Sequence, residues 1–357
     1  MQIRTATDFD GPRLARLLLD NPMAVGTDFA LDRTPDFNAL LRLRGNFRTF
    51  CAYSGGRLAG AVTALWDERC DHGKSVRVGE IIDLRVALPF RGGRTTSLLL
   101  RAAQRALEEA GVQWVFCLIG DQNQAARVLV RGRVGIRALQ PLTRYVSVHY
   151  LALRMNFLSL RRGLRLRAAE NTSIADAEAI AQGFAQIAEG RRLATQSRPL
   201  WPDPTGRHRA WLVHAAGGEV VGGLVIWDGF DVRRIRVMRY SGLDRLMKLL
   251  TVPAARLGLA VSLPEPGGAL RLWASRAFWA EGDRPDIVRA MVAAALDDAV
   301  KQGVHVVQLN LPHGDPLIDQ LPRYPRSSYW STLYGVRRDG GPVDKASGPF
   351  HAELALV

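Results

Sequence analysis

Apolar and polar residues alternate along the chain in short stretches typical of strands, and longer helical patterns separate them. An apolar strand is predicted over Glu80–Val86, followed by a Gly-containing turn and a long helix rich in Ala and Leu. Side chains two residues apart in a strand share a face, so Glu80, Leu84 and Val86 are expected to line one side. Another apolar strand is predicted over Val112–Ile119, after the helix.

The same pattern of elements occurs twice. Each copy has a hairpin with a Gly-Gly turn, an Ala-rich helix that ends at a glycine, and an apolar strand after that helix. The matched segments are 57–64 and 219–226, 98–112 and 290–304, and 114–118 and 306–309. We therefore predict two tandem domains, 1–152 and 153–357, which dock closely because their connector is rich in Arg and not in Gly and Ser.

The second copy is longer than the first by about 30 residues between its hairpin and its helix, which places an insertion at about 233–266. Within it, Leu243–Leu250 has the pattern of a basic amphipathic helix. Three interpretations stay open: a lid over an acceptor pocket, a helix that binds a partner, and a packing element across the domain junction. The packing element is favoured, because long insertions often serve that purpose.

The turn in the first copy has the properties of a phosphate-binding loop. The first turn of a helix lacks internal acceptors for its amides, and the helix dipole adds positive potential there. Glycines let the backbone approach a ligand closely, and arginines supply charge-assisted hydrogen bonds to a pyrophosphate. The candidate residues are Arg91, Gly92, Gly93, Arg94, Thr95 and Thr96.

This order of strand, Arg-Gly turn and helix resembles the coenzyme A motif of the GNAT superfamily of acyl-CoA N-acyltransferases. Val86 matches the end of the family's strand, and Arg91 and Gly92 match the start of its loop. Arg94 and Thr96 stand where the family normally has glycines. The resemblance implies an α/β fold (α+β in some schemes) of two GNAT-like domains, each with a mixed, mostly antiparallel sheet flanked by helices. It also implies that the loop, together with Leu84 and Val86, binds acetyl-CoA or a related short acyl-CoA.

The segment after the second strand extends the resemblance. Asn123, Ala126 and Gly135-Ile136 fit the family's Asn-x-x-Ala and Gly-Phe positions. The resemblance implies that Asn123 contacts the pantetheine arm, although capping of the following helix explains this residue at least as well. The family's tyrosine, the usual general acid toward the departing thiolate, falls at Val130, so water or another group would have to protonate the thiolate.

Glu80 lies where many members keep a strand glutamate as general base, and it is the one catalytic residue that the resemblance implies. A structural carboxylate that bridges neighbouring groups is an equally good interpretation. The second copy has Leu272 at the position that we match to Glu80, and it has Asp283, Arg284 and Pro285 in place of the phosphate loop. We expect this copy to be degenerate, because Pro285 brings no N–H.

Composition adds limits to this interpretation. The 357 residues are 47% hydrophobic and 23% charged, as in a globular protein of two domains. We see no leader or membrane-span pattern, and we expect a cytoplasmic protein without membrane contact. Cys51, Cys70 and Cys117 are expected to be reduced, and the histidines lack metal-ligand spacing, so no metal is predicted. The charge of +14 is spread along the chain without a recognition motif, which makes nucleic acid an unlikely partner.

We therefore expect an N-acyltransferase, most simply an N-acetyltransferase, that moves the acyl group of acetyl-CoA to a primary amine in its N-terminal domain. The acceptor is a small molecule or a peptide, and the protein is a monomer or a homodimer. The alternative is a catalytically degenerate protein that binds coenzyme A or another anion as a sensor or scaffold. A basic nucleic-acid module is a third, less favoured class.

Overall fold

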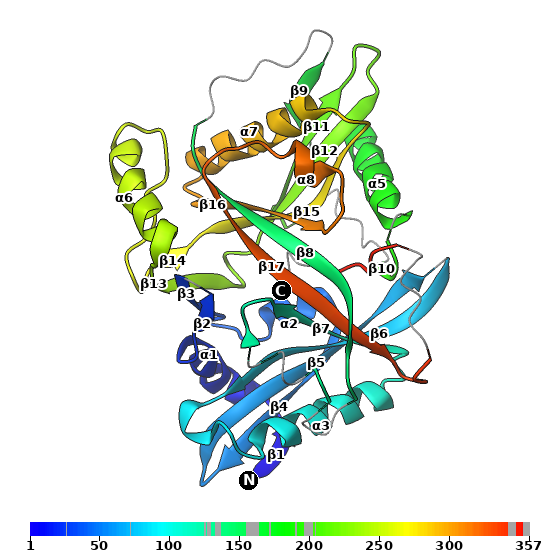
Figure 1. Cartoon of the computed structure of the whole chain (residues 1–357), viewed down its shortest axis with the longest axis vertical. Coiled ribbons are helices and arrows are strands. Elements are labelled where there is room, and N and C mark those ends of the chain that lie inside the picture. Colours follow the sequence, from blue (N-terminus) through cyan, green and yellow to red (C-terminus); the bar gives the residue numbers. More distant parts are fainter. Residues whose placement is uncertain are drawn as a thin grey trace.

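A computed structural model describes residues 1–25, 27–71, 73–124, 126, 130–132, 137–154, 164–170, 173–189, 191–195, 203, 205–341 and 348–352. It shows helices packed on both faces of a large, strongly twisted sheet (Figure 1). Most of the connector 153–164 and a short strand that we predicted over 353–357 lie outside the described residues.

The N-terminal half (residues 1–152) follows the predicted order of elements. Its elements are β1 (Gln2–Thr5), η1 (Asp8–Asp10), α1 (Gly11–Leu19), β2 (Met23–Val25), β3 (Thr27–Asp32), α2 (Ala39–Arg44), β4 (Asn46–Ser54), β5 (Arg57–Asp71), β6 (Lys74–Val86), η2 (Leu88–Phe90), α3 (Thr95–Glu109), β7 (Trp114–Gly120) and β8 (Gln140–Leu151). The strand Glu80–Val86 is the last part of β6, and the Ala- and Leu-rich helix is α3.

The C-terminal half (residues 153–357) repeats this order. Its elements are β9 (Arg165–Ala168), α5 (Ile174–Glu189), β10 (Ala194–Thr195), β11 (His208–His214), β12 (Val220–Asp228), β13 (Arg234–Arg239), α6 (Gly242–Arg256), β14 (Ala269–Leu270), β15 (Leu272–Ala280), α7 (Pro285–Lys301), β16 (Val306–Pro312), α8 (Leu317–Gln320) and β17 (Arg326–Arg337). The mixed α/β fold class predicted from the sequence is confirmed, since both halves contribute a mixed, mostly antiparallel sheet flanked by helices.

Equivalent glycines support the match between the halves. A Cβ on Gly60 would lie 3.1 Å from a methyl carbon of Leu99 in α3, and a Cβ on Gly222 would lie 2.8 Å from a methyl carbon of Ile287 in α7. Each glycine thus lets a helix approach the sheet closely. Gly60 pairs with Val86 on the next strand, as Gly222 does with Ala280.

The two halves share one sheet through exchanged strands. Its order is β1-β4-β5-β6-β7-β17-β8-β16-β15-β12-β11-β9, with β10 added beside β5. Strand β17, from the C-terminal half, lies between β7 and β8, and β8, from the N-terminal half, pairs with β16. Figure 1 shows β8 and β17 as long strands that run through the centre of the molecule. Backbone hydrogen bonds therefore hold the halves together, as close docking requires.

The insertion forms a second, small sheet and one exposed helix. Strand β13 pairs with β3 of the N-terminal half, as the packing interpretation expects. Helix α6 behaves differently, because only Met247 and Thr251 are buried along its length. Its leucines are largely exposed, and the helix lies at the periphery of the molecule (Figure 1). Packing across the junction thus explains β13, but it does not explain why the leucines of α6 are exposed to solvent.

Candidate functional site

The turn between β6 and α3 is exposed and its amides are free. Residues 91–94 are all exposed, and within the described residues no acceptor contacts the backbone N–H groups of residues 92–97. The first amide of this region with an internal acceptor is that of Leu98, which donates to Arg94 O at 3.0 Å. No side chain caps α3 at Arg94. A row of free N–H groups at the start of a 15-residue helix can bind an anion such as a diphosphate.

Side chains of the loop differ in how they are held. Gly92 has a φ of +77°, a left-handed conformation that favours glycine. Arg91 is fixed by the protein itself, since its Nε donates to Val86 O at 3.1 Å and its Nη2 to Asn21 Oδ1 at 2.7 Å. Arg94 makes no such contact and is exposed; Thr95 is buried and Thr96 half-buried. Of the two arginines, Arg94 is therefore the one with a guanidinium available to a ligand.

Strands β6 and β7 separate just before this turn. They pair in parallel only at Val78, Gly79 and Glu80, whereas β6 continues to Val86 along β5 and β7 continues to Gly120 along β17. The edge of β6 that faces away from β5 thus lacks a strand partner over residues 81–86. Those backbone groups lie between Glu80 and the free amides of the turn. A ligand whose amide groups hydrogen-bond like a strand fits this opening.

A β-bulge interrupts β6 within the same segment. Ile82 pairs with Thr63 and Arg85 with Ala61, which leaves Asp83 and Leu84 without a partner on β5. Asp83 has a φ of +55°, an uncommon conformation for a residue other than glycine. Leu84 and Val86 pack with the cluster beneath α3. Ile81 lies in the same cluster, whereas Ile82 packs beside α1, so Glu80 and Ile82 lie on the opposite face from Leu84 and Val86. The prediction that Glu80 shares a face with Leu84 and Val86 is therefore wrong, because the bulge shifts the alternation.

Glu80 is buried and bridges two arginines. Its Oε1 accepts a hydrogen bond from Arg69 and its Oε2 one from Arg44, and all three side chains are buried. Burial alone favours the neutral acid, but the charges of Arg44 and Arg69 outweigh it and lower the pKa of Glu80. An ion-paired carboxylate with a lowered pKa is a weak base. This geometry favours the bridging interpretation of Glu80, and its role as base stays a prediction.

The segment after β7 is described only in part. Asn123 is exposed and its Oδ1 accepts a hydrogen bond from the backbone N–H of Ala126 at 3.1 Å, which is the capping contact expected from the sequence. Val130 is buried against Ile119, so its position contributes to the core. Gly135-Ile136 lies outside the described residues. The pantetheine contact of Asn123 stays a prediction.

The equivalent segment of the C-terminal half differs from this arrangement in detail. Strands β15 and β16 also pair in parallel over only a short stretch, with Ala274 opposite Gln308 where Glu80 lies opposite Phe116. The ladder therefore places Ala274 at the position of Glu80, two residues from the Leu272 that the sequence match gave. The backbone N–H of Arg284, at the start of α7, donates to Gln320 Oε1 at 3.2 Å. This amide is therefore not available to a phosphate, and Pro285 has no N–H to offer.

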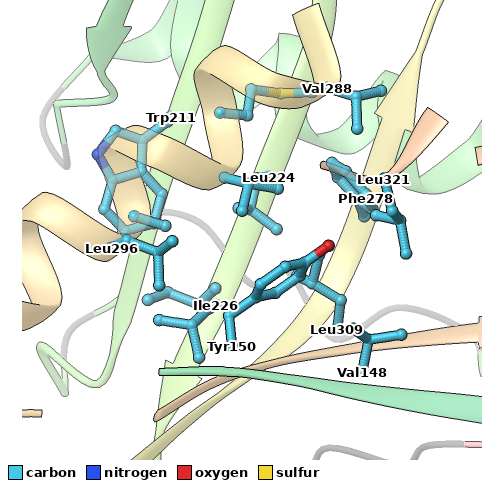
Figure 2. Packing of buried hydrophobic residues seen from close by; sticks show 14 of the residues in the cluster. Val148, Tyr150, Trp211, Leu224, Ile226, Phe278, Val288, Leu296, Leu309 and Leu321 are labelled. Atoms are coloured by element: carbon cyan, nitrogen blue, oxygen red, sulfur yellow. The ribbon is translucent and has the colours of Figure 1, made fainter. Parts of the chain in front are cut away.

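Apolar side chains fill the space beside α7. Figure 2 shows Tyr150 from β8, Leu309 from β16, Phe278 from β15 and Leu321 after α8 packed together, and all four are buried. The space beside α7 is therefore hydrophobic core, and the degeneracy of the second copy stays a prediction.

Sequence reasoning missed the arginines around Glu80 and Asp83. Asp83 forms a two-bond ion pair with Arg33, at 2.6 and 2.9 Å, and Glu80 is held by Arg44 and Arg69. These arginines come from three separate segments, so spacing along the chain gave no signal. The high arginine content was the only hint, and it did not say which arginines converge.

Within the described residues no group of three or more His, Cys, Asp or Glu side chains has the arrangement of a metal site. No described helix is both long enough and apolar enough to cross a membrane. Both findings concern only the part of the chain that the structure describes.

Comparison with known proteins finds one family model that matches part of this chain and solved structures with a similar fold. Residues 13–133 match the model of the Acetyltransferase (GNAT) family. A crystal structure of Saccharomyces cerevisiae N-myristoyltransferase with bound myristoyl-CoA has a TM-score of 0.55 and 11% identity, covering 98% of this chain and 89% of that chain. Another structure of that yeast enzyme with bound myristoyl-CoA has a TM-score of 0.56 and 12% identity, covering 98% of this chain and 84% of that chain.

A probable N-acyltransferase from Enterococcus faecalis V583 has a TM-score of 0.49 and 10% identity, covering 94% of this chain and 72% of that chain. A search of curated protein sequences gives no match to this chain. The yeast enzymes share the fold of the whole chain, and the family model matches the part that contains the open loop and the separated strands. Residues 13–133 therefore match the GNAT family, and the chain as a whole has the fold of the yeast N-myristoyltransferase structures.

Proposed function

We propose that the protein transfers an acyl group, most simply acetyl, from acyl-CoA to a primary amine, and that the N-terminal half carries the reaction. The observation that supports this most is the row of N–H groups of residues 92–97, which have no acceptor among the described residues and lie next to the edge of β6 that no described strand pairs. The amides would hold the diphosphate, with Arg94 close by, and the edge of β6 would hold the pantetheine arm. Adjacent backbone segments would thus fix two neighbouring parts of one acyl-CoA molecule, the diphosphate and the pantetheine arm.

A short acyl group fits this arrangement better than a long one. The thioester would lie where β6 and β7 separate, near Glu80. The sheet face on that side is filled by Trp114, Phe116 and Tyr145, which pack with Phe350 in a buried aromatic cluster. A long chain would have to displace these rings, which costs several kcal/mol for each large side chain lost from a core. Acetyl-CoA is therefore the proposed donor.

The chemistry needs no covalent intermediate on the protein. The neutral amine of the acceptor attacks the thioester carbonyl, the new C–N bond forms as the C–S bond breaks, and the departing thiolate takes up a proton. The amine loses one proton to solvent or to a base. Holding both reactants in place removes much of the entropic barrier. Because Val130 is buried where the family has its acid, we propose that water protonates the thiolate.

A second candidate function is acyl-CoA binding without turnover. It is favoured by the two ion pairs of Glu80, which engage both of its oxygens and lower its pKa. In that case the N-terminal half would bind coenzyme A as a sensor or scaffold, and the free amides of the loop would serve binding alone.

Calorimetric titration with acetyl-CoA, followed by a thiol-release assay over a panel of amines, separates the two functions. Micromolar binding together with amine-dependent release of the thiol supports the transferase. Binding without release with any amine supports the sensor. Absence of binding would contradict both, because each depends on the amides of residues 92–97.

A further inference from the structure

Arginines outnumber carboxylates around the bulge of β6. Arg33, whose side chain is 2% exposed, is paired with Asp83, whose side chain is 8% exposed. Arg85 lies two positions after Asp83 on the same strand, close enough to Arg33 and Arg91 for their charges to act on it. Arg233 lies near Arg33, since β13 pairs with β3 at Arg234 and Asp32. One carboxylate, Asp83, therefore faces several guanidinium groups.

Two of these arginines, Arg33 and Arg85, are incompletely satisfied by the described part of the chain. Arg33 Nε is buried and has no hydrogen-bond partner in the described part of the chain. The single hydrogen bond found there for the Arg85 guanidinium goes to the carbonyl oxygen of its neighbour Leu84, at 3.0 Å. Burial lowers the pKa of Arg85, and it lowers the pKa of Arg233 to about 10. Partly buried cations near one another are costly unless an anion joins them.

We propose that Arg33 and Arg85 bind an anionic group, a carboxylate or a phosphate, of the acceptor. This inference rests on the proposed function, because it assigns a class of acceptor to the same site. The bulge that carries Asp83 and Arg85 interrupts the segment of β6 where the pantetheine arm is proposed to bind. An anion held there brings an amine of the same small molecule close to the thioester, whereas a neutral amine lacks this contact.

The test uses pairs of amines that differ only in charge: an amino acid and its amide, and O-phosphoethanolamine and ethanolamine. We expect the anionic member of at least one pair to raise the melting temperature of the protein in the absence of donor. The Arg85→Met variant, which keeps most of the side-chain length, is expected to lose this response. Arg94→Glu, which alters the phosphate loop, is the matched control and is expected to keep it.

A rise in melting temperature with the amino acid indicates a carboxylate site, and a rise with O-phosphoethanolamine indicates a phosphate site. Equal effects of charged and neutral members, or a response that survives in Arg85→Met, would overturn the inference. Because melting needs no turnover, this outcome is distinct from failure of the proposed function, which would show as absence of thiol release with every amine. If thiol is released, the anionic member should also have at least a tenfold higher kcat/KM in the unaltered protein.

A separate observation concerns α6. Of the twelve large hydrophobic residues exposed in the described chain, eight lie between residues 238 and 259. On α6 itself Leu243, Leu246, Leu249 and Leu250 are 61%, 52%, 63% and 62% exposed. So many exposed leucines on one helix mark an interaction surface.

The charges around these leucines are mostly positive. Arg245 and Arg256 are exposed on α6, and Arg239, which precedes it with 71% of its side chain exposed, is paired with Asp28. The acid on the first turn, Asp244, turns inward, where it accepts a hydrogen bond from Thr27 at 2.6 Å. A second copy of this chain would bring like charges together across a symmetric contact. An anionic lipid surface offers both an apolar interior and complementary charge.

We infer that α6 binds reversibly to the surface of a membrane that contains anionic lipid, without crossing it. Sedimentation with vesicles of phosphatidylglycerol and phosphatidylcholine should retain the protein, and vesicles of phosphatidylcholine alone should retain at least tenfold less. Replacing both Leu246 and Leu250 by Ser should abolish retention without lowering the melting temperature, because both side chains are exposed. Leu88→Ser, at a 72% exposed leucine outside this surface, is the control.

Retention that is equal in the double variant would overturn the inference. So would a concentration-dependent dimer, detected by light scattering, that the double variant abolishes, because the leucines would then face a second copy of the chain.

Discussion

The backbone N–H of Arg284, the residue before α7, donates a hydrogen bond to Gln320 Oε1 at 3.2 Å. At the start of the equivalent helix, α3, the N–H groups of residues 92–97 have no acceptor among the described residues. We expect one molecule of acetyl-CoA to bind per chain, which calorimetric titration measures directly. A stoichiometry of two would show that the C-terminal site opens and binds.

Arg94→Glu tests the open loop. Arg94 is exposed and makes no ion pair within the described residues, so reversal of its charge should weaken binding of acetyl-CoA at least tenfold and leave the melting temperature unchanged. Arg105→Glu makes the same change further along α3 and should alter affinity much less. Equal losses in the two variants would mean that the overall charge of the protein, and not the loop, governs binding.

Arg91→Glu tests the other arginine of the loop, and its effect on acetyl-CoA binding is harder to separate from an effect on stability. Because Arg91 is bonded to Val86 O and Asn21, the substitution should lower stability as well as affinity. Thermal melting and calorimetry on the same variant measure the two losses. A loss of affinity alone would show that these internal contacts contribute little.

Glu80→Gln removes the charge that holds Arg44 and Arg69. We expect the variant to lose about 3 kcal/mol of unfolding free energy, because two buried guanidinium groups would be left without a carboxylate. Chemical denaturation measures this loss, and Glu109→Gln, at a 65% exposed partner of Arg48, should change stability by less than about 1 kcal/mol. If Glu80 is also the base, the variant should lose turnover in a thiol-release assay while its affinity for acetyl-CoA stays intact.

His149 makes stability depend on pH in the weakly acidic range. Burial lowers its pKa from 6.5 to about 4, so the folded protein keeps it neutral where the unfolded chain binds a proton. Its contribution to stability is therefore complete above pH 6.5 and declines as the pH falls from 6.5 toward 4. Denaturation at several pH values should show this decline, and His149→Gln should reduce it. Asp203 has a different effect, because its pKa is lowered to about 2 in the folded protein. Its contribution to stability is present above the pKa of the unfolded chain and is lost as the pH falls toward 2.

The order of elements followed from the sequence because it depends on local patterns. The apolar residues of Glu80–Val86 indicate a buried strand, and the Ala- and Leu-rich segment after it indicates a helix. The glycines between them indicate a turn, because glycine allows backbone conformations that other residues avoid. The repeat identified the second copy for the same reason, and Pro285 and Asp283 already indicated that its loop was lost. The free amides of residues 92–97 are likewise a local property of a helix start.

Tertiary structure decided what those patterns could not. The exchange of β8 and β17 depends on pairing between strands almost two hundred residues apart, and alternation is the same whichever strand lies alongside. The role of Glu80 depends on Arg44 and Arg69, which reach it from α2 and β5, and the charge of the site depends on Arg33 and Arg85. Ion pairs form between side chains that the fold brings together, so their effect on a carboxylate is set by distance in space and not by spacing along the chain.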